Sequence, residues 1–303
     1  MATGDGEYDN SLPSSIEVPN HIVRVNVDPI STPINQRRSE RNCGGRIDYK
    51  NTCRRPAAAK KGGKCGLTPF SINGIEKLPN KTCTSLLNGD INPFIRLLGS
   101  FLKSRSKMSL MSANEPVLQA IVEALLPVKR RVPELLLVMD GMKKKGSGRF
   151  GMADVFVLSD GGGKATILEL KYVALSGLMK AKGLFTFGAN DLEVLDKDLE
   201  EKGRESVLDL KYTYWSKALN KNITTTVRDI LTGAESQARA YMGAVEKGWV
   251  TASKNSGVCD RRVDVTNSRG RLNGFVVVVI GFRQILWKQV GEQTTKYRFR
   301  KIG

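Results

Sequence analysis

The sequence of 303 residues is poor in the side chains that many enzymes use for catalysis. Histidine occurs once, as His21, so Ser-His-Asp triads, Cys-His pairs and histidine-rich metal sites are excluded from the rest of the chain. The five cysteines contain no C-x-x-C pair, which favours a reducing compartment over a disulfide scaffold. Four of them could hold a zinc ion, but their spacings match no common zinc finger and isolated thiols are the better prediction: Cys43, Cys53, Cys65 and Cys83.

Long apolar segments are missing as well. No run of about eighteen apolar residues occurs, so no transmembrane helix is predicted. The first ten residues contain three acids, no base and no apolar stretch, so we expect neither a secretory signal nor a transit peptide.

Positive charge, in contrast, is abundant. Lysine and arginine together number 48, against 30 aspartates and glutamates, which gives a net charge of +18. Such an excess favours a polyanionic partner, nucleic acid first and an anionic membrane surface second.

Residues 1–85 are predicted to form a disordered basic tail, because they contain clusters of Pro, Ser, Asn and Gly and no sustained periodicity. Ten lysines and arginines fall within residues 36–64. The stretch Arg-Arg-Pro-Ala-Ala-Ala-Lys-Lys at 54–61 resembles a bipartite nuclear import signal and predicts a nuclear protein. The alternative is a solvated tail that adds nonspecific attraction to phosphate.

Residues 86–303 are predicted to form one α/β domain. Hydrophobic periodicity predicts helices over about 113–126 and 226–247, and strands over 134–139, 152–158, 165–172, 275–280 and 285–290. The αβββαβ order predicts a mixed central sheet flanked by helices. The polar segment over about 185–225 is predicted to be helical.

One predicted strand carries charge among apolar residues. Alternation over 165–172 places Glu169 and Lys171 on the same face, and buried charge is costly unless it is paired or metal-bound. A hairpin with the preceding strand would set Asp154 beside Glu169. Two carboxylates and a backbone carbonyl, that of Leu170, suit Mg²⁺ or Mn²⁺, and Lys171 could stabilise charge on a phosphate. The alternative is an exposed Glu-Lys pair and an ordinary hairpin aspartate.

Asp154 followed after fourteen residues by Glu169-Leu170-Lys171 resembles the D…E-x-K signature of the PD-(D/E)XK nuclease superfamily. The αβββαβ order is similar to the restriction-endonuclease-like core of that superfamily, over about residues 112–282. Further matches look like fungal members, some of them attached to Crinkler-type effectors: Asn114-Glu115, residues 148–151, residues 167–172 and Gln237-x-x-x-Tyr241. The chain departs from the signature before Asp154, where Met152-Ala153 replaces proline.

The resemblance implies a role for each matched residue. Asp154 and Glu169, with the carbonyl of Leu170, would bind the metal, and Lys171 would be the catalytic lysine. Three accessory catalytic residues would line the site: Glu115, Gln237 and Tyr241. For Glu115 a capping box with Ser112 is an equal alternative, and Tyr241 could simply pack in the core.

A cationic loop precedes the strand that carries Asp154. Its cations are expected to contact a nucleic-acid backbone, although a plain charged hairpin loop would have the same composition: Lys143, Lys144, Lys145 and Arg149. Together the patterns predict a Mg²⁺-dependent nuclease acting on DNA in preference to RNA, with no membrane partner. The alternatives are a catalytically silent nucleic-acid-binding module and a host-nucleus effector on the same fold. No pattern indicates an oligomeric state.

Overall fold

The computed structural model describes residues 72–217, 219–251 and 255–302, with side chains from residue 78 onward. The predicted import signal and most of the predicted tail lie outside the described residues. The last part of the predicted tail is instead helical, because helix α1 spans Ile72–Leu87 and buries Cys83, Leu86 and Leu87. The ordered domain therefore begins earlier than residue 86.

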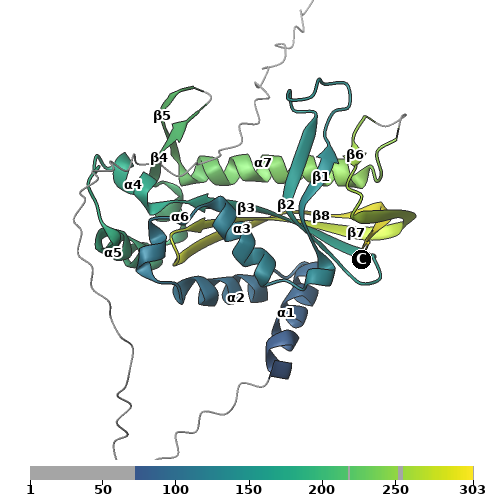
Figure 1. The fold of residues 1–303 in the computed structure, drawn as a ribbon, viewed down its shortest axis with the longest axis horizontal. Helices are drawn as coiled ribbons and strands as arrows, with labels where there is room; N and C mark the ends of the chain where they lie inside the picture. The colour runs from purple at the N-terminus through teal and green to yellow at the C-terminus, as the bar shows by residue number, and fades with distance from the viewer. Residues whose placement is uncertain (1–71, 218, 252–254, 303) are drawn as a thin grey trace, which may run out of the picture.

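A six-stranded mixed sheet forms the centre of the domain, in the order β6-β1-β2-β3-β7-β8 (Figure 1). Strand β3 runs parallel to β7, and every other neighbouring pair is antiparallel. Two register irregularities along β7 and β8 bend this long ribbon and curl the sheet. The strands are β1 Arg131–Val138, β2 Phe150–Leu158, β3 Lys164–Val173, β6 Gly257–Val258, β7 Val263–Ile280 and β8 Gln284–Lys301.

Helices cover both faces of the sheet. Helix α7, Val227–Glu246, packs on β3 and β7 from one side, and α1 and α2 lie on the other side in Figure 1. Residues 275–280 of β7 are therefore buried throughout, as their continuous apolar sequence predicts for a strand covered on both faces. The remaining helices are α2 Asn92–Lys103, α3 Glu115–Ala124, α4 Leu175–Ala181, α5 Ala189–Glu200 and α6 Arg204–Leu208, with 3₁₀ turns at Lys107–Leu110 and Val128–Arg130.

The predicted αβββαβ order is present as α3, β1, β2, β3, α7 and β7. The prediction of a helical segment over about 185–225 is wrong for its last part. There, β4 Lys211–Ser216 and β5 Lys221–Thr226 form a separate two-stranded hairpin. Aromatic and threonine side chains, which favour strands, outweigh the polar composition that suggested a helix. No helix among the described residues is long and apolar enough to cross a membrane.

Candidate functional site

Strands β2 and β3 bring Asp154 and Glu169 to the same face of the sheet. Their antiparallel pairing includes Val155 opposite Leu168, so Asp154 and Glu169 come one step further along the same register. Because opposite residues in a sheet point to the same face, the two carboxylates lie on one side. At the next residue of β3, the backbone N–H of Leu170 donates a hydrogen bond to Oδ2 of Asp154 at 2.7 Å. The Asp154 side chain thus takes the place of the β2 carbonyl that would otherwise accept this N–H.

The ammonium group of Lys171 contacts two carboxylates, one on its own strand β3 and one at the start of α3. Its Nζ donates to Oε1 of Glu169 at 2.7 Å and to Oε1 of Glu115, the first residue of α3, at 3.3 Å. Glu169 is fully buried, whereas the side chains of Lys171 and Glu115 are 20% and 32% exposed. The cluster therefore reaches the surface through Lys171 and Glu115 and has its buried base at Glu169.

Glu115 does not form the capping box with Ser112 that was the alternative interpretation. The N-cap of α3 is Asn114, whose Oδ1 accepts the N–H of Val117 at 3.1 Å. This leaves the Glu115 carboxylate free to turn toward Lys171. The start of α3 therefore positions the Glu115 carboxylate at the end of the cluster that faces solvent.

Burial dominates the electrostatics of the cluster. It raises the pKa of Glu169 to about 8, with Asp154 and Glu115 adding to the rise and Lys171 opposing it. Burial also raises the pKa of Glu115. For Lys171, burial lowers the pKa, but the charges of Glu169, Glu115 and Asp154 outweigh it and raise the pKa above its ordinary value. Three carboxyl groups thus share one ammonium, and near neutral pH the cluster retains a proton that a cation could replace.

A divalent cation fits the donor atoms of this cluster. Oε2 of Glu169 is buried and has no hydrogen-bond partner, which is costly for a carboxylate oxygen. Within the described ranges, no three His, Cys, Asp or Glu side chains are arranged to hold a metal by themselves. Asp154 and Glu169 would therefore need the carbonyl of Leu170 and water. That carbonyl lies on the β2 side, because the N–H and C=O of one strand residue point the same way.

Gln237 and Tyr241 of α7 form one wall beside the acids. Nε2 of Gln237 donates to the hydroxyl of Tyr241 at 2.8 Å. Burial raises the pKa of Tyr241, and the charge of Glu169 raises it further, which places the phenol within electrostatic range of the cluster. A Cβ on Gly151 would lie 2.7 Å from Cε1 of Tyr241, so glycine at this position lets the ring approach β2.

The predicted cationic loop connects β1 and β2 and projects from the domain (Figure 1). Lys143, Lys144 and Lys145 are exposed, and Lys143 lies 3.9 Å from Asp140. Arg149 is half-buried, with its guanidinium 5.5 Å from the centre of the Phe150 ring. Three cations of the loop are thus open to solvent, and the fourth is held at its base.

Sequence reasoning missed two neighbours of the cluster. Tyr212 of β4 is close enough to Glu115 for the carboxylate charge to contribute to the raised pKa of the phenol, whose main cause is burial. Glu134 has a φ of 46° and lies between the pairs Pro133–Val155 and Leu135–Ala153 of the β1–β2 register, at the level of Asp154. A left-handed backbone is uncommon for glutamate and marks a local constraint beside the site. The alternation of Tyr212 and Tyr214 was the signal for β4, whereas nothing in the sequence indicates the conformation of Glu134.

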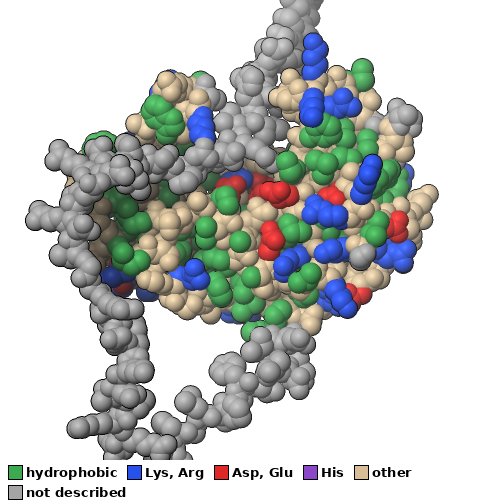
Figure 2. Space-filling view, in the orientation of Figure 1, with side chains coloured by type: hydrophobic (Ala, Val, Ile, Leu, Met, Phe, Trp, Pro, Cys, Tyr) green, Lys and Arg blue, Asp and Glu red, His purple; other side chains and the backbone are tan. Residues whose placement is uncertain are grey.

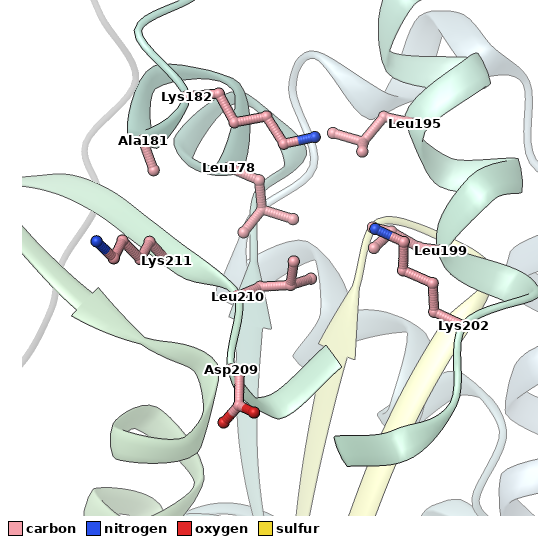
Figure 3. A pocket seen from close by; sticks show the side chains of 9 residues that line it. All are labelled: Leu178, Ala181, Lys182, Leu195, Leu199, Lys202, Asp209, Leu210 and Lys211. Carbon is pink, nitrogen blue, oxygen red and sulfur yellow. The ribbon is translucent and has the colours of Figure 1, made fainter. Parts of the chain in front are cut away.

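Two cavities lie away from this cluster. One, of about 230 Å³, lies between α4, α5 and the start of β4 and is lined by four leucines and three lysines among others, with the ammonium groups of Lys182 and Lys202 directed toward it (Figure 3). The other, of about 500 Å³, adjoins the β2–β3 turn. Neither is lined by Asp154, Glu169 or Lys171. Figure 2 instead shows acidic side chains gathered toward the middle of an open face.

Comparisons of the chain with protein-family models, with curated proteins and with solved structures found no match. The functional conclusion therefore depends on the described residues and their chemistry.

Proposed function

We propose that this chain is a metal-dependent nuclease with a PD-(D/E)XK-type, restriction-endonuclease-like core, and that it hydrolyses phosphodiester bonds of DNA. The observation that carries the proposal is the cluster of Asp154, Glu169 and Lys171 on one face of β2 and β3, with two carboxylates and one ammonium in contact or in electrostatic range. The order of the elements around this cluster, α3, β1, β2, β3, α7 and β7, supports the same assignment.

Asp154, Glu169 and the carbonyl of Leu170 would hold Mg²⁺ or Mn²⁺. The bound cation supplies a water of lowered pKa and offsets charge on the phosphate. The buried, unpartnered Oε2 of Glu169 supports this assignment, because it needs a cation, a proton or a donor.

Lys171 acts as a permanent cation. Its pKa lies above the ordinary value, so Nζ keeps its protons at neutral pH and is unsuited to act as a general base. It is suited to donate a hydrogen bond to the attacking water or to a phosphate oxygen. Glu115 also accepts a hydrogen bond from Nζ and so positions it, and Gln237 and Tyr241 form the α7 wall of the site.

The basic character of the chain supports a nucleic-acid substrate. A net charge of +18 provides affinity for a phosphate backbone, and the exposed lysines of the β1–β2 loop project from the same domain as the cluster. Such contacts discriminate little between base sequences, so binding should weaken steeply with salt. Nuclear localisation remains a prediction from residues 54–61.

The proposal is tested by incubating the purified chain with supercoiled plasmid and Mg²⁺ or Mn²⁺, with EDTA as the metal-free arm. The wild type should nick the plasmid, and Asp154→Ala and Lys171→Ala should not. Lys164→Ala is the matched control, since Lys164 is an exposed lysine on the same strand and bonds Asn88 outside the cluster. Equal nicking by all four proteins would refute the site. Metal-independent binding without cleavage would instead indicate the silent binding module.

A further inference from the structure

The β4–β5 hairpin is anchored by one face and open on the other. Tyr212 is buried, and its ring lies against Gly177 of α4, where an added Cβ would overlap it. Tyr212 also stacks on Tyr214, with ring centroids 6.0 Å apart. These contacts hold the base of the hairpin against the domain, while the strands project away from it (Figure 1).

The opposite face of the hairpin presents Trp215 to solvent. Alternation along β4 places Lys211, Thr213 and Trp215 together, and β5 adds Asn222 and Thr224 across the strand pair. Trp215 is 53% exposed. An indole with half of its surface in water contributes little to the core, so packing does not explain this tryptophan.

The composition of the hairpin identifies the chemistry of its ligand. Residues 211–226 contain three lysines and no acid. Lys211 lies on the face of Trp215, and Lys217 follows the end of β4. Lys221, which pairs with Ser216, lies on the other face. Lysines neutralise phosphates, and an exposed aromatic ring stacks on a base, which is how proteins bind single-stranded nucleic acids. A fully paired duplex offers no free base face to an indole. The surface therefore fits an unpaired strand.

The hairpin also lies next to the acidic cluster. Its Tyr212 is within electrostatic range of Glu115. Figure 1 shows the β4–β5 hairpin and the cationic β1–β2 loop projecting from the same side of the domain, and Figure 2 shows acidic side chains near the middle of the face in view. A strand held by the hairpin could therefore continue to the cluster.

From these observations we infer that the β4–β5 hairpin is a second nucleic-acid-binding element, on which Trp215 stacks against an unpaired base of the substrate. The inference rests on the proposed function for the identity of its ligand. It adds that the substrate contains a single-stranded segment, such as a flap, a gap or a frayed end.

The test measures binding in EDTA, so that it is independent of cleavage. A fluorescein-labelled single strand of DNA and the matching blunt duplex are titrated with the full chain, with Trp215→Ala and with Trp215→Phe, and fluorescence anisotropy is recorded. Trp215→Ala should bind the single strand about 5- to 100-fold more weakly, the range expected for loss of one base stack. Trp215→Phe should fall between the wild type and Trp215→Ala, and the blunt duplex should be affected less.

Val194→Ala is the matched control, because Val194 of α5 is an apolar residue with 59% exposure outside the hairpin. It should bind both DNAs as the wild type does. Equal affinity of wild type and Trp215→Ala for the single strand, or no binding of DNA by the wild type, overturns the inference. If the wild type does not nick plasmid but its binding of the single strand depends on Trp215, only the proposed hydrolysis is refuted. If Lys171→Ala loses nicking but Trp215→Ala binds the single strand as the wild type does, only the role of the hairpin is refuted.

Discussion

Nζ of Lys171 lies 2.7 Å from Oε1 of Glu169, two positions earlier on the same strand, and Glu169 is fully buried. Desolvation outweighs the attraction within this pair, because burial raises the pKa of Glu169 to about 8 even beside the Lys171 ammonium, and apolar residues of similar volume often serve the fold as well. The pair therefore has little structural justification among the apolar residues that surround it on the strand, Ile167, Leu168 and Leu170. A role in binding charge explains it better.

The catalytic role proposed for Lys171 predicts that its replacement causes a large loss of activity while the fold is preserved. Lys171→Met keeps much of the side-chain volume and removes the ammonium, so plasmid nicking in Mg²⁺ should fall at least about 100-fold, as for loss of one charge-stabilising donor. Initial nicking rates measure this, and thermal unfolding verifies that the variant is folded. Nicking by Lys171→Met at the rate of Lys164→Ala would contradict the assignment.

The raised pKa of Glu169 predicts that the metal-free protein becomes less stable as pH rises. The unfolded chain releases this proton near pH 4.5, whereas the folded protein retains it until about pH 8. The stabilisation is complete below pH 4.5 and is lost by about pH 8, with a difference of about 5 kcal/mol over that window. Urea unfolding in EDTA at several pH values measures the free energy of unfolding. It should decrease less with rising pH for Glu169→Gln than for the wild type, whereas Glu292→Gln, at an exposed carboxylate, should show the same pH dependence as the wild type. The same pH dependence of the free energy of unfolding in all three proteins would contradict the prediction.

The proposed metal site predicts that the melting temperature of the protein depends on metal concentration. Binding to the folded state alone stabilises it by about 2.7 kcal/mol at a free Mn²⁺ concentration 100 times the Kd. Differential scanning fluorimetry should show that added Mn²⁺ raises the melting temperature of the wild type and changes that of Asp154→Asn little. Asp209→Asn is the control, since Asp209 is an exposed carboxylate paired with Arg228. A rise of equal size in Asp154→Asn would place the metal elsewhere.

The lysines of the β1–β2 loop predict a salt-dependent contribution to DNA binding. Each phosphate contact contributes about −0.9 to the slope of log K against log salt. Replacing Lys143, Lys144 and Lys145 by Gln should make the slope less steep by up to about 2.7 and weaken binding at low salt. Anisotropy titrations across a salt series measure both. An unchanged slope would show that these cations do not touch the backbone.

The contact between the β4–β5 hairpin and α4 predicts that two glycine-to-alanine substitutions have opposite effects on stability. A Cβ on Gly177 would overlap the Tyr212 ring and lie 2.9 Å from the carbonyl of Thr213, so Gly177→Ala should destabilise the fold by about 1–3 kcal/mol. Gly243 of α7 has open space at its Cβ, so Gly243→Ala should stabilise the helix by up to about 1 kcal/mol. Urea unfolding of both variants distinguishes these outcomes, and equal effects would argue against the close contact.

Apolar patterning was sufficient to predict β2, β3, α7 and the last part of β7, residues 275–280, because each contributes apolar side chains to the core. The first part of β7 was not predicted. Patterning failed for α1, which contains Pro79 and little regular pattern and becomes helical as Cys83, Leu86 and Leu87 pack against the sheet. It also failed for the β4–β5 hairpin. The polar residues on one face of the hairpin made the segment look like a polar helix, although Tyr212 and Tyr214 on the other face alternate as in a strand.

The sequence by itself determined which residues carry charge at apolar positions, since alternation along one strand already places Glu169 and Lys171 on a common face. Only the tertiary structure decided that Glu115 reaches Lys171, that Asp154 bonds the backbone of Leu170, and that Tyr212 comes within electrostatic range of Glu115. The physical reason is that strand alternation is a local property of the chain. Contacts between α3, β3 and β4 depend instead on how distant segments pack over the sheet.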